Sequence, residues 1–370
     1  MRKKFELITA VSFSLIIVLF GIMFFAFPDK NVSEIENRSL QTLPRFSFKS
    51  LFDTTYISKL EDYFTDQFPL RSSFINLKTN VSKLLFKDEV NNVYFADDYL
   101  IEKYNELEIK DSIVDVLNEF SSKINYVNLN LMLAPTSTSV NSEKLPNTLI
   151  MDSELDDIDY IYDKIKFNKI KIYDELNNSG YQTFYKTDHH WTSYGAFLAY
   201  LKYASMNNIE SIKIQDFKIE EVTNSFCGTY CSKSGDFNHL NDSIHTFTYK
   251  DYDLDVKYVG SDVVTKSLYN KDYLNKKDKY SMFLDNNHPL IIITNNDIIS
   301  ASEIVVIKDS YANSFIPFLV NHFKRVHVID PRYYKLSISD YILNNKKIKD
   351  ALILYNMGTI GSDTGILSIE

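Results

Sequence analysis

With 370 residues, the chain is long enough for two or more domains of about 150 residues each, so a peptide or a single small module is excluded. Apolar residues make up 45% and charged residues 24%, as is typical of a folded globular protein and not of a disordered or fibrous one. The 40 Lys and Arg against 49 Asp and Glu give a net charge of −9, spread without long blocks of one sign. The sequence therefore offers no basic stripe for duplex nucleic acid, and we expect no nucleic-acid partner.

The amino terminus predicts a membrane segment. The stretch from Leu7 to Phe27 has 21 residues and no charge, and a helix of that length spans about 31 Å, the thickness of a bilayer's hydrocarbon core. The basic residues 2–4 should stay cytoplasmic by the positive-inside rule, which places everything after Pro28 on the far side of the membrane. We expect an uncleaved anchor at residues 1–28. A cleaved signal peptide is the main alternative, although residues 25–28 make a poor cleavage site, and a buried core helix is the least favoured one.

Beyond the anchor, the hydrophobic pattern divides the chain into two parts. Residues 29–90 carry short amphipathic stretches and predict a helical stalk, with helices over 58–68 and 71–86. From residue 91 to residue 370, strands alternate with helices, which predicts an α/β domain with a mostly parallel sheet and flanking helices. The stretch from about 210 to 298 is rich in β-type runs and is expected to form an inserted subdomain or lid.

The middle of this α/β domain predicts four elements before the insertion. An apolar strand closed by Pro135 is expected first and a helix second, followed by a short strand and a further helix. They are expected at residues 127–134, 158–176, 181–185 and 193–203.

The last quarter of the chain predicts three apolar strands, and each delivers a polar side chain at its carboxyl end. The three side chains are Ser310, Arg332 and Asn356, and a helix over 311–323 should follow the first strand. In an open parallel sheet such strand ends face one crevice, where ligands bind. The strands are expected at residues 304–307, 326–329 and 351–355.

The side chains at these strand ends can support nucleophilic catalysis. A serine hydroxyl needs a base beside it, and a carboxylate fixes the tautomer of that base. Asp188 and His190 follow a predicted strand and are two residues apart, so in an extended segment they point to the same face. We predict Ser310 as nucleophile, His190 as base and Asp188 as its partner. The backbone N–H of Ser310 and the side chain of Asn356 are predicted oxyanion donors.

Each of these residues also has an ordinary structural interpretation. Alone, Ser310 would be a helix cap, His190 a hydrogen-bonded structural histidine and Asp188 a turn residue. We favour packing roles for His189 and for Trp191, the only tryptophan, with substrate contact as the alternative for both.

Metal and thiol chemistry are the less favoured alternatives at this point of the chain. A metal site from Asp188, His189 and His190 is disfavoured because adjacent histidines diverge and the other histidines lack ligand spacing. Cys227 and Cys231 are the only cysteines, and we expect a local disulfide or idle thiols.

The motif around His190 resembles a known family. The segment Thr187–Thr192 reads T-D-H-H-W-T and is identified with the motif of the bacterial DHHW protein family, which is similar to the SGNH-hydrolase-like acetyltransferases of alginate modification, AlgJ and AlgX. The likeness extends to Glu36-Asn37-Arg38, to residues 66–71 (D-Q-F-P-L-R) and to residues 308–311 (K-D-S-Y). It implies an SGNH-like, flavodoxin-like fold, with acid and base at Asp188 and His190 and the nucleophile at Ser310.

The resemblance is incomplete at the oxyanion site. It implies an oxyanion role for Asn356, but Arg332 stands where such enzymes present a glycine, and Lys308 replaces the glycine of their Gly-Asp-Ser. Arg332, Trp191, His189 and Tyr311 are kept as candidate substrate-binding residues. G-x-S-x-G is missing from the sequence, which argues against an ordinary α/β-hydrolase.

Together these features favour a membrane-anchored, extracytoplasmic serine O-acetyltransferase acting on a cell-surface or secreted polysaccharide, without a cofactor or metal. The resemblance implies a membrane-bound O-acyltransferase partner as acetyl donor. A carbohydrate acetylesterase with the same triad, and a non-catalytic polysaccharide-binding or scaffold module, are the alternatives. A Ser310 Oγ to His190 nitrogen distance within about 3.5 Å would favour catalysis over the scaffold.

Overall fold

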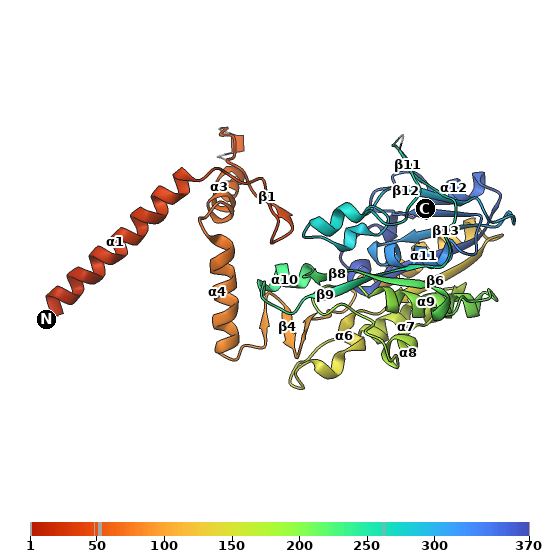
Figure 1. Ribbon diagram of the computed structural model, residues 1–370, viewed down its shortest axis with the longest axis horizontal. Helices are drawn as coiled ribbons and strands as arrows, with labels where there is room; N and C mark the ends of the chain where they lie inside the picture. Colours follow the sequence, from red (N-terminus) through yellow and green to blue (C-terminus); the bar gives the residue numbers. More distant parts are fainter. Residues whose placement is uncertain (1, 48, 51–53, 262, 370) are drawn as a thin grey trace. The chain divides into compact units, whose positions relative to one another are not determined.

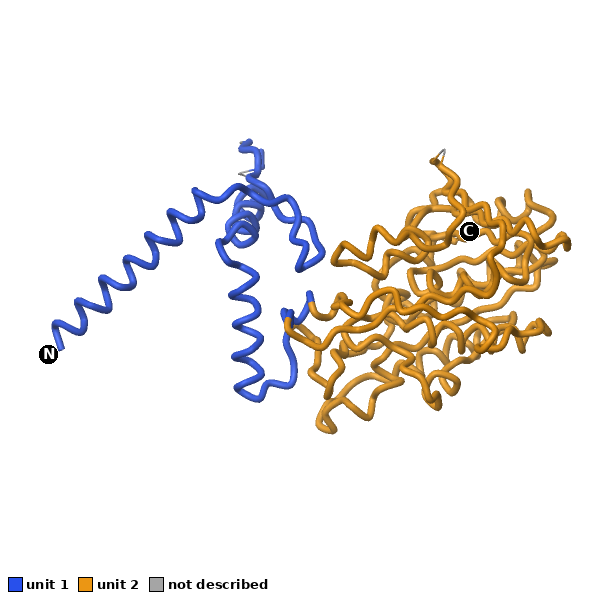
Figure 2. The backbone as a smooth tube through the Cα atoms, viewed as in Figure 1, with its two compact units in different colours: residues 1–90, 232–237 blue, residues 91–231, 238–370 orange. Residues whose placement is uncertain are grey.

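The computed structural model describes residues 2–47, 49–50, 54–261 and 263–369, which form two compact units (Figures 1 and 2). Unit 1 contains residues 1–90 and 232–237, and unit 2 contains residues 91–231 and 238–370. Each unit is described by itself.

Among its described residues, unit 1 contains three helices of twelve or more residues. The first helix is apolar and its side chains are exposed, and by length and composition it is able to cross a membrane. Pro69 separates the other two helices because proline lacks the N–H that a helix interior needs. The helices are α1 (Arg2–Ala26), α3 (Thr55–Asp66) and α4 (Arg71–Leu84), and the short strands are β1 (Val32–Ser33), β2 (Arg38–Ser39) and β3 (Glu89–Val90).

Ion pairs join the β1–β2 hairpin to the turn between α3 and α4. The Arg38 guanidinium pairs with Asp66 at 2.5 Å and with Glu36 at 2.8 Å, and Glu36 also pairs with Arg71. These residues belong to the E-N-R and D-Q-F-P-L-R segments quoted above. Both motifs therefore serve the architecture of unit 1.

Unit 2 is an α/β unit around a mixed sheet. Among the described residues, eight strands form this sheet in the order β11-β10-β12-β14-β13-β15-β6-β7, and the run from β14 to β7 is parallel. The three strands at the other edge pair antiparallel. The strands are β6 (Asn128–Ala134), β7 (Asn168–Lys169), β10 (Leu254–Tyr258), β11 (Val264–Thr265), β12 (Leu290–Asn295), β13 (Glu303–Lys308), β14 (Arg325–Ile329) and β15 (Ile348–Asn356).

Two smaller pairs of strands lie outside this sheet. They are β4 (Val93–Ala96) with β5 (Tyr99–Glu102), and β8 (Lys218–Phe226) with β9 (Asp242–Thr248), both antiparallel. The segment 210–298, expected as a β-rich insertion, thus supplies β8 and β9 as a separate ribbon, whereas β10, β11 and β12 extend the main sheet.

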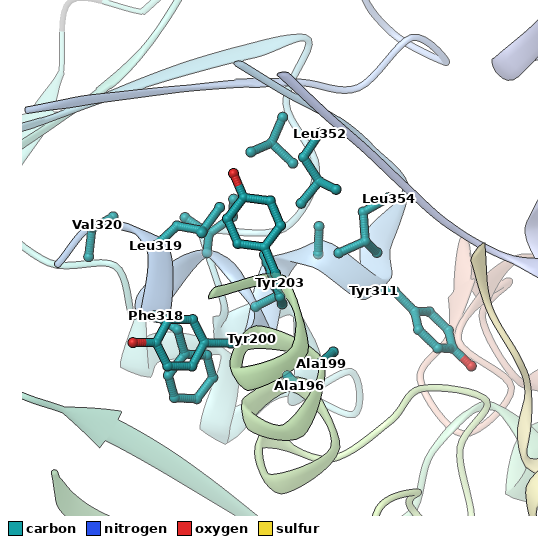
Figure 3. Packing of buried hydrophobic residues seen from close by; sticks show 14 of the residues in the cluster. Ala196, Ala199, Tyr200, Tyr203, Tyr311, Phe318, Leu319, Val320, Leu352 and Leu354 are labelled. Atoms are coloured by element: carbon teal, nitrogen blue, oxygen red, sulfur yellow. The ribbon is translucent and has the colours of Figure 1, made fainter. Parts of the chain in front are cut away.

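Both faces of the central strands are buried, which explains their unbroken apolar sequence. Ile304 and Val306 of β13 face one cluster, while Val305 and Ile307 face the other, because successive side chains of a strand point to opposite sides. The first cluster contains Tyr200 and other residues of α9 (Ser193–Met206; Figure 3). The second contains side chains of α5 (Lys110–Lys123), α7 (Glu154–Lys164) and α12 (Ile338–Asn344).

The helices of unit 2 lie between or after these strands. They are α5 (Lys110–Lys123), α6 (Ser137–Val140), α7 (Glu154–Lys164), α8 (Tyr173–Asn177), α9 (Ser193–Met206), α11 (Ile316–Leu319), α12 (Ile338–Asn344) and α13 (Met357–Ile360), and α10 (Thr229–Ser234) begins in this unit. Short 3₁₀ turns are η1 (Ser142–Lys144), η2 (Ile214–Asp216), η3 (Lys271–Asn275), η4 (Tyr280–Met282), η5 (Ser310–Ser314) and η6 (Ile366–Ser368).

Three predicted elements differ from the structure. The helix expected over 311–323 is replaced by η5 and the short α11, because Pro317 fits the first turn of a helix and not its interior. The helix expected over 158–176 ends at Lys164, after which β7 adds to the sheet edge beside β6. The strand expected at 181–185 is reduced to one bridge between Phe184 and Trp191.

Candidate active site

Ser310 lies where the central strand β13 ends and η5 begins. The preceding residue, Asp309, caps η5 by accepting a hydrogen bond from the backbone N–H of Tyr311 at 2.9 Å. Ser310 is partly exposed, whereas the residues on both sides of it are buried. The strand-to-helix turn therefore holds a serine hydroxyl at the carboxyl edge of the sheet, as the sequence predicts.

The DHHW segment forms a tight turn that leads into α9. The backbone N–H of Tyr185 donates to His190 O, and the N–H of Thr192 donates to Thr183 O. The hydroxyl of Thr192 then caps α9 by accepting from Gly195 N–H at 3.2 Å. The turn thus fixes the backbone of His190 beside a capped helix.

The structure brings Ser310, His190 and Asp188 together. His190 Nε2 lies 2.8 Å from Ser310 Oγ, and His190 Nδ1 lies 2.6 Å from Asp188 Oδ1. An ionised carboxylate only accepts hydrogen bonds, so Nδ1 must carry the proton and Nε2 of a neutral ring is free to accept one from the serine hydroxyl. This is the arrangement of nucleophile, base and orienting carboxylate that acyl transfer requires.

Asp188 is buried but stays ionised. Burial alone would raise the pKa of its carboxyl, but His189, His190 and the hydrogen bonds from His190 and from Thr229 N–H together hold the pKa well below its ordinary value. A permanently charged acceptor at this position keeps the imidazole of His190 in one tautomer.

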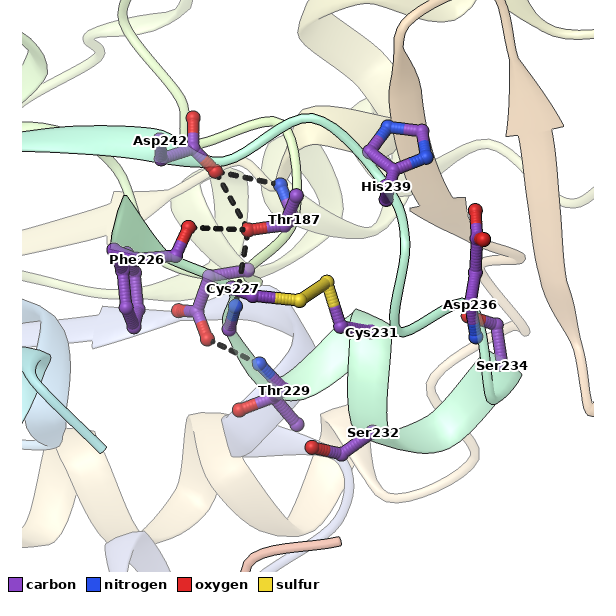
Figure 4. The surroundings of a disulfide bond; sticks show 12 residues. Thr187, Phe226, Cys227, Thr229, Cys231, Ser232, Ser234, Asp236, His239 and Asp242 are labelled. Atoms are coloured by element: carbon purple, nitrogen blue, oxygen red, sulfur yellow. Dashed lines mark hydrogen bonds between the residues drawn. A yellow bond between two sulfur atoms is a disulfide. The ribbon is translucent and has the colours of Figure 1, made fainter. Parts of the chain in front are cut away.

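A loop closed by a disulfide holds the DHHW segment from the other side. Cys227 and Cys231 are bonded to each other, and between them Thr229 N–H donates to Asp188 Oδ2 at 2.7 Å (Figure 4). A Cβ added at Gly228 would collide with the Asp188 side chain, so glycine is required for this close approach. The sequence suggests the disulfide but not its position beside Asp188.

The same loop also holds Thr187. Gly228 N–H donates to Thr187 Oγ1 at 3.0 Å, and Tyr230 N–H donates to Thr187 O. The carboxylate of Asp242 accepts from both the N–H and the hydroxyl of Thr187 (Figure 4). Thr187 is thus fixed on both sides, and the carboxylate of the neighbouring residue is fixed with it.

Tyr280 is a site residue that the sequence analysis missed. Its ring stacks on the imidazole of His190, with centroids 3.7 Å apart and planes 13° apart. Its hydroxyl donates to Ser310 O at 3.1 Å and also contacts Ser314 Oγ. Tyr280 comes from η4, in a segment without a motif and among 26 tyrosines, so no signal in the sequence could single it out.

Two of the candidate substrate-binding residues are packing residues. Trp191 is fully buried, and its indole Nε1 donates to Tyr311 O at 2.9 Å and to Ser314 Oγ at 3.0 Å. Tyr311 is fully buried as well, and its hydroxyl donates to His189 O. These contacts join the DHHW turn to η5 and so set the spacing between His190 and Ser310.

His189 has the most exposed side chain of the four-residue motif, with 34% of its surface accessible. Partial burial of its ring and the neighbouring His190 lower the pKa of His189. Ligand atoms of Asp188, His189 and His190 lie within 4.8 Å of one another. However, both nitrogens of His190 are already engaged, so a metal there would have to displace Ser310 or Asp188.

Asn356 and Arg332 differ from their predicted roles. Asn356 Nδ2 donates to Asp309 Oδ2 and to Thr359 Oγ1, both at 2.5 Å, which uses both amide hydrogens. Arg332 makes a bidentate ion pair with buried Asp330 at 2.8 and 2.6 Å. The strand ends do bring these residues to the crevice edge, but each side chain is held by a neighbouring carboxylate. Neither is a free oxyanion donor.

One backbone donor lies directly beside the Ser310 hydroxyl. The backbone N–H of Ser310 opens η5, where the first N–H groups of a helical turn have no partner within the turn. Among the described residues, nothing accepts a hydrogen bond from it.

The chain resembles proteins of one family. The DHHW protein family matches residues 86–329, a range that contains the DHHW motif and Ser310. None of the curated proteins matches the chain. The family predicted from the motif is confirmed.

Solved structures share the fold. A DHHW family protein from Eubacterium siraeum is 23% identical, with a TM-score of 0.66 over 75% of this chain and 95% of its own. PatB1 from Bacillus cereus, described with a sulfonyl adduct, is 21% identical, with a TM-score of 0.64 over 75% and 98%. The O-acetyltransferase domain of Pseudomonas putida AlgJ is a weaker match, with 12% identity and a TM-score of 0.45 over 72% and 91%. The predicted α/β fold is confirmed.

Proposed function

The chain belongs to the DHHW protein family, and from that premise we propose that it is a membrane-anchored, extracytoplasmic serine O-acetyltransferase. It modifies a cell-surface or secreted polysaccharide through an acetyl-Ser310 intermediate. The observation that carries the proposal is the chain of contacts Ser310–His190–Asp188, with separations of 2.8 and 2.6 Å. The first of these meets the 3.5 Å criterion stated above, which favours catalysis over a scaffold role.

The two half-reactions use the same three side chains. His190 Nε2 takes the proton of Ser310 as its Oγ attacks the carbonyl carbon of an acetyl donor, and the imidazolium then returns that proton to the leaving group. A sugar hydroxyl next gives its proton to His190 and attacks the acetyl-serine ester, after which Ser310 regains its proton. Asp188 stabilises the imidazolium in both halves.

The tetrahedral intermediate of each half-reaction carries a negative oxygen. We assign the Ser310 backbone N–H as one donor to it, because this group opens a helical turn beside the reacting hydroxyl. The side chain of Asn356 is not assigned as a donor to this oxygen. It donates a hydrogen bond to Asp309, the residue that caps η5.

The proposed location of the reaction rests on α1 as a membrane anchor. An anchor formed by this helix, with the basic residues 2–4 inside the cell, places residues after Pro28 outside. Acetyl-CoA is a cytoplasmic donor, so we propose that a multispanning membrane-bound O-acyltransferase supplies the acetyl group. The acetyl donor and the polysaccharide acceptor are inferred from the resemblance of the DHHW and D-S-Y motifs.

The test is acyl-enzyme formation by the full-length protein in detergent. Wild type, Ser310→Ala and His190→Ala are incubated with p-nitrophenyl acetate, and intact mass is measured; Ser300→Ala, at an exposed serine, is the matched control. We expect an acetyl adduct and turnover with wild type and the control only. A sulfonyl fluoride should label the same two proteins. Equal adducts on wild type and Ser310→Ala would overturn the proposal.

A second measurement separates transfer from hydrolysis. Acetate release and acetylation of an added oligosaccharide are followed together, because water and a sugar hydroxyl compete for one acyl-enzyme. We expect the sugar product to dominate as acceptor concentration rises. Acetate release that no oligosaccharide reduces would identify an acetylesterase with the same triad.

A further inference from the structure

The amphipathic helix α4 of unit 1 buries its polar side and exposes its apolar side. Buried Thr79 donates from its hydroxyl to Ser234 O at 2.7 Å, and Ser82 is buried too. Lys83 pairs with Asp236 at 2.5 Å. The segment 232–237 therefore covers the polar side of α4 through hydrogen bonds and an ion pair.

The opposite side of α4 is an exposed apolar stripe. Its members follow at intervals of three, four and three residues, which places them on one line along a helix. Each has between 44% and 76% of its surface accessible to solvent. Removal of this apolar surface from water would lower the free energy of the protein. We call it the α4 stripe, and it consists of Phe74, Leu77, Val81 and Leu84.

The stripe is continuous with the helix that is able to cross a membrane. Phe20 of α1 packs against Phe68 and Phe74, with ring centroids 5.3 and 5.7 Å apart. One turn further along α1, the ring of Phe24 lies 5.4 Å from that of Phe64. The amino-terminal end of α4 thus contacts α1 itself.

These contacts set the depth of α4. Phe20 precedes Phe27, the end of the apolar run, by seven residues, so at 1.5 Å per residue it lies about 10 Å inside the outer boundary of that run. A ring packed on Phe20 must then lie within the same leaflet. A hydrophobic partner for the stripe is already present at this depth, namely the lipid acyl chains.

We propose that the α4 stripe, with Phe64 and Phe68, is inserted in the extracytoplasmic leaflet of the membrane, so that unit 1 is held by an interfacial helix in addition to α1. The inference rests on the anchoring part of the proposed function. Exposed Lys78 lies beside the stripe, where its ammonium can reach the headgroup region while its stem lies along the acyl chains.

The test measures contact with lipid at single positions. Both native cysteines are in the disulfide, so one added cysteine is a unique thiol for a fluorophore. The full-length variants Leu77→Cys, Leu15→Cys in α1 and Lys347→Cys at an exposed site of unit 2 are labelled. They are then reconstituted in vesicles of purified phospholipid with a nitroxide on the acyl chain. No other protein is present.

We expect fluorescence loss at Leu77 comparable to that at Leu15, with little loss at Lys347. Loss at Leu15 without loss at Leu77 would overturn the α4 proposal while leaving the anchor intact, and it would indicate a protein as the partner of the stripe. No loss at Leu15 would overturn the anchor as well. Turnover of p-nitrophenyl acetate by the same samples reports separately on the proposed acyl chemistry and on folding.

Discussion

Asp188 and Asp309 are two buried carboxylates near Ser310, and the structure holds them in opposite ways. Asp188 contacts the imidazole of His190 and also accepts hydrogen bonds from the backbone N–H groups of His190 and Thr229, and the neighbouring histidines lower its pKa. Asp309 directly precedes Ser310. Burial raises its pKa to about 6, although the hydrogen bonds that it accepts from two backbone N–H groups lower this pKa. The pKa values of two buried carboxylates are thus shifted in opposite directions, because only Asp188 is in direct contact with a histidine ring.

The two carboxylates have different contacts, and we expect different roles for them. In the proposed reaction Asp188 orients the ring that moves the proton, whereas Asp309 joins the start of η5 to the end of β15 through Tyr311 and Asn356. Closeness to Ser310 in sequence is therefore no guide to contact with the proposed base. Substitution of each carboxylate by its amide should separate activity from stability.

The largest effect is expected for Asp188→Asn. The amide cannot hold His190 as a charged acceptor does, and kcat/KM should fall on the order of 10⁴-fold, the size expected when the carboxylate of a triad is neutralised. Thermal unfolding of the variant, measured in parallel, serves as the control for folding. A loss under tenfold would remove Asp188 from the mechanism.

Asp309→Asn should change the pH dependence of stability. The ordinary pKa of an aspartate is near 4 and the folded value is about 6, so the folded state keeps a proton that the unfolded state releases between these pH values. Stability of the wild type therefore falls as pH rises through this window, by about 3 kcal/mol in total. The asparagine side chain of the variant does not titrate in this pH window. It also has one carboxylate oxygen fewer to accept hydrogen bonds from Asn356.

The measurement is urea unfolding of both proteins between pH 4 and pH 7, with the exposed Glu210→Gln as control. The free energy of unfolding of Asp309→Asn should lie below wild type, and the gap should narrow as pH rises. Parallel curves for the two proteins would contradict the raised pKa of Asp309.

Motif and strand-end reasoning predicted the three residues that meet in the triad. Ser310, His190 and Asp188 each follow a strand or extended segment, and local pattern locates such positions well. The same reasoning placed Asn356 and Arg332 at the crevice edge but assigned them free donor groups. Their partners, Asp309 and Asp330, also lie at strand ends, and the sequence does not reveal which neighbours will pair.

The sequence does not predict which residues of short or irregular segments contact the site. Tyr280 and Thr229 reach the site from a 3₁₀ turn and from the first residue of the short helix α10, which are too short for a hydrophobic period to place them. In α4 the helical period was recognised from the sequence, but no partner was predicted for its apolar side. Periodicity defines a face, and only tertiary context decides what covers it.

Gly228→Ala tests the loop that sets the position of Asp188. The added Cβ would collide with the carboxylate, which must move or lose its bond from Thr229 N–H, and a displacement near 1 Å costs about 10²-fold in rate. Gly180→Ala is the matched control, since a Cβ there meets no atom within 4 Å. Equal kcat/KM in both variants would show that Asp188 is positioned without the loop.

The smallest effect is expected for Tyr280→Phe. Asp188 holds His190 at its edge, whereas Tyr280 covers its face, and phenylalanine preserves the stack while removing the hydroxyl that donates to Ser310 O. Loss of one such bond is worth about 1 kcal/mol, so kcat should fall about fivefold. Tyr280→Ala also removes the ring and should lower kcat further, because His190 then loses its contact on one face. Equal losses in the two variants would place the whole effect in the hydroxyl and leave Asp188 alone to orient the imidazole.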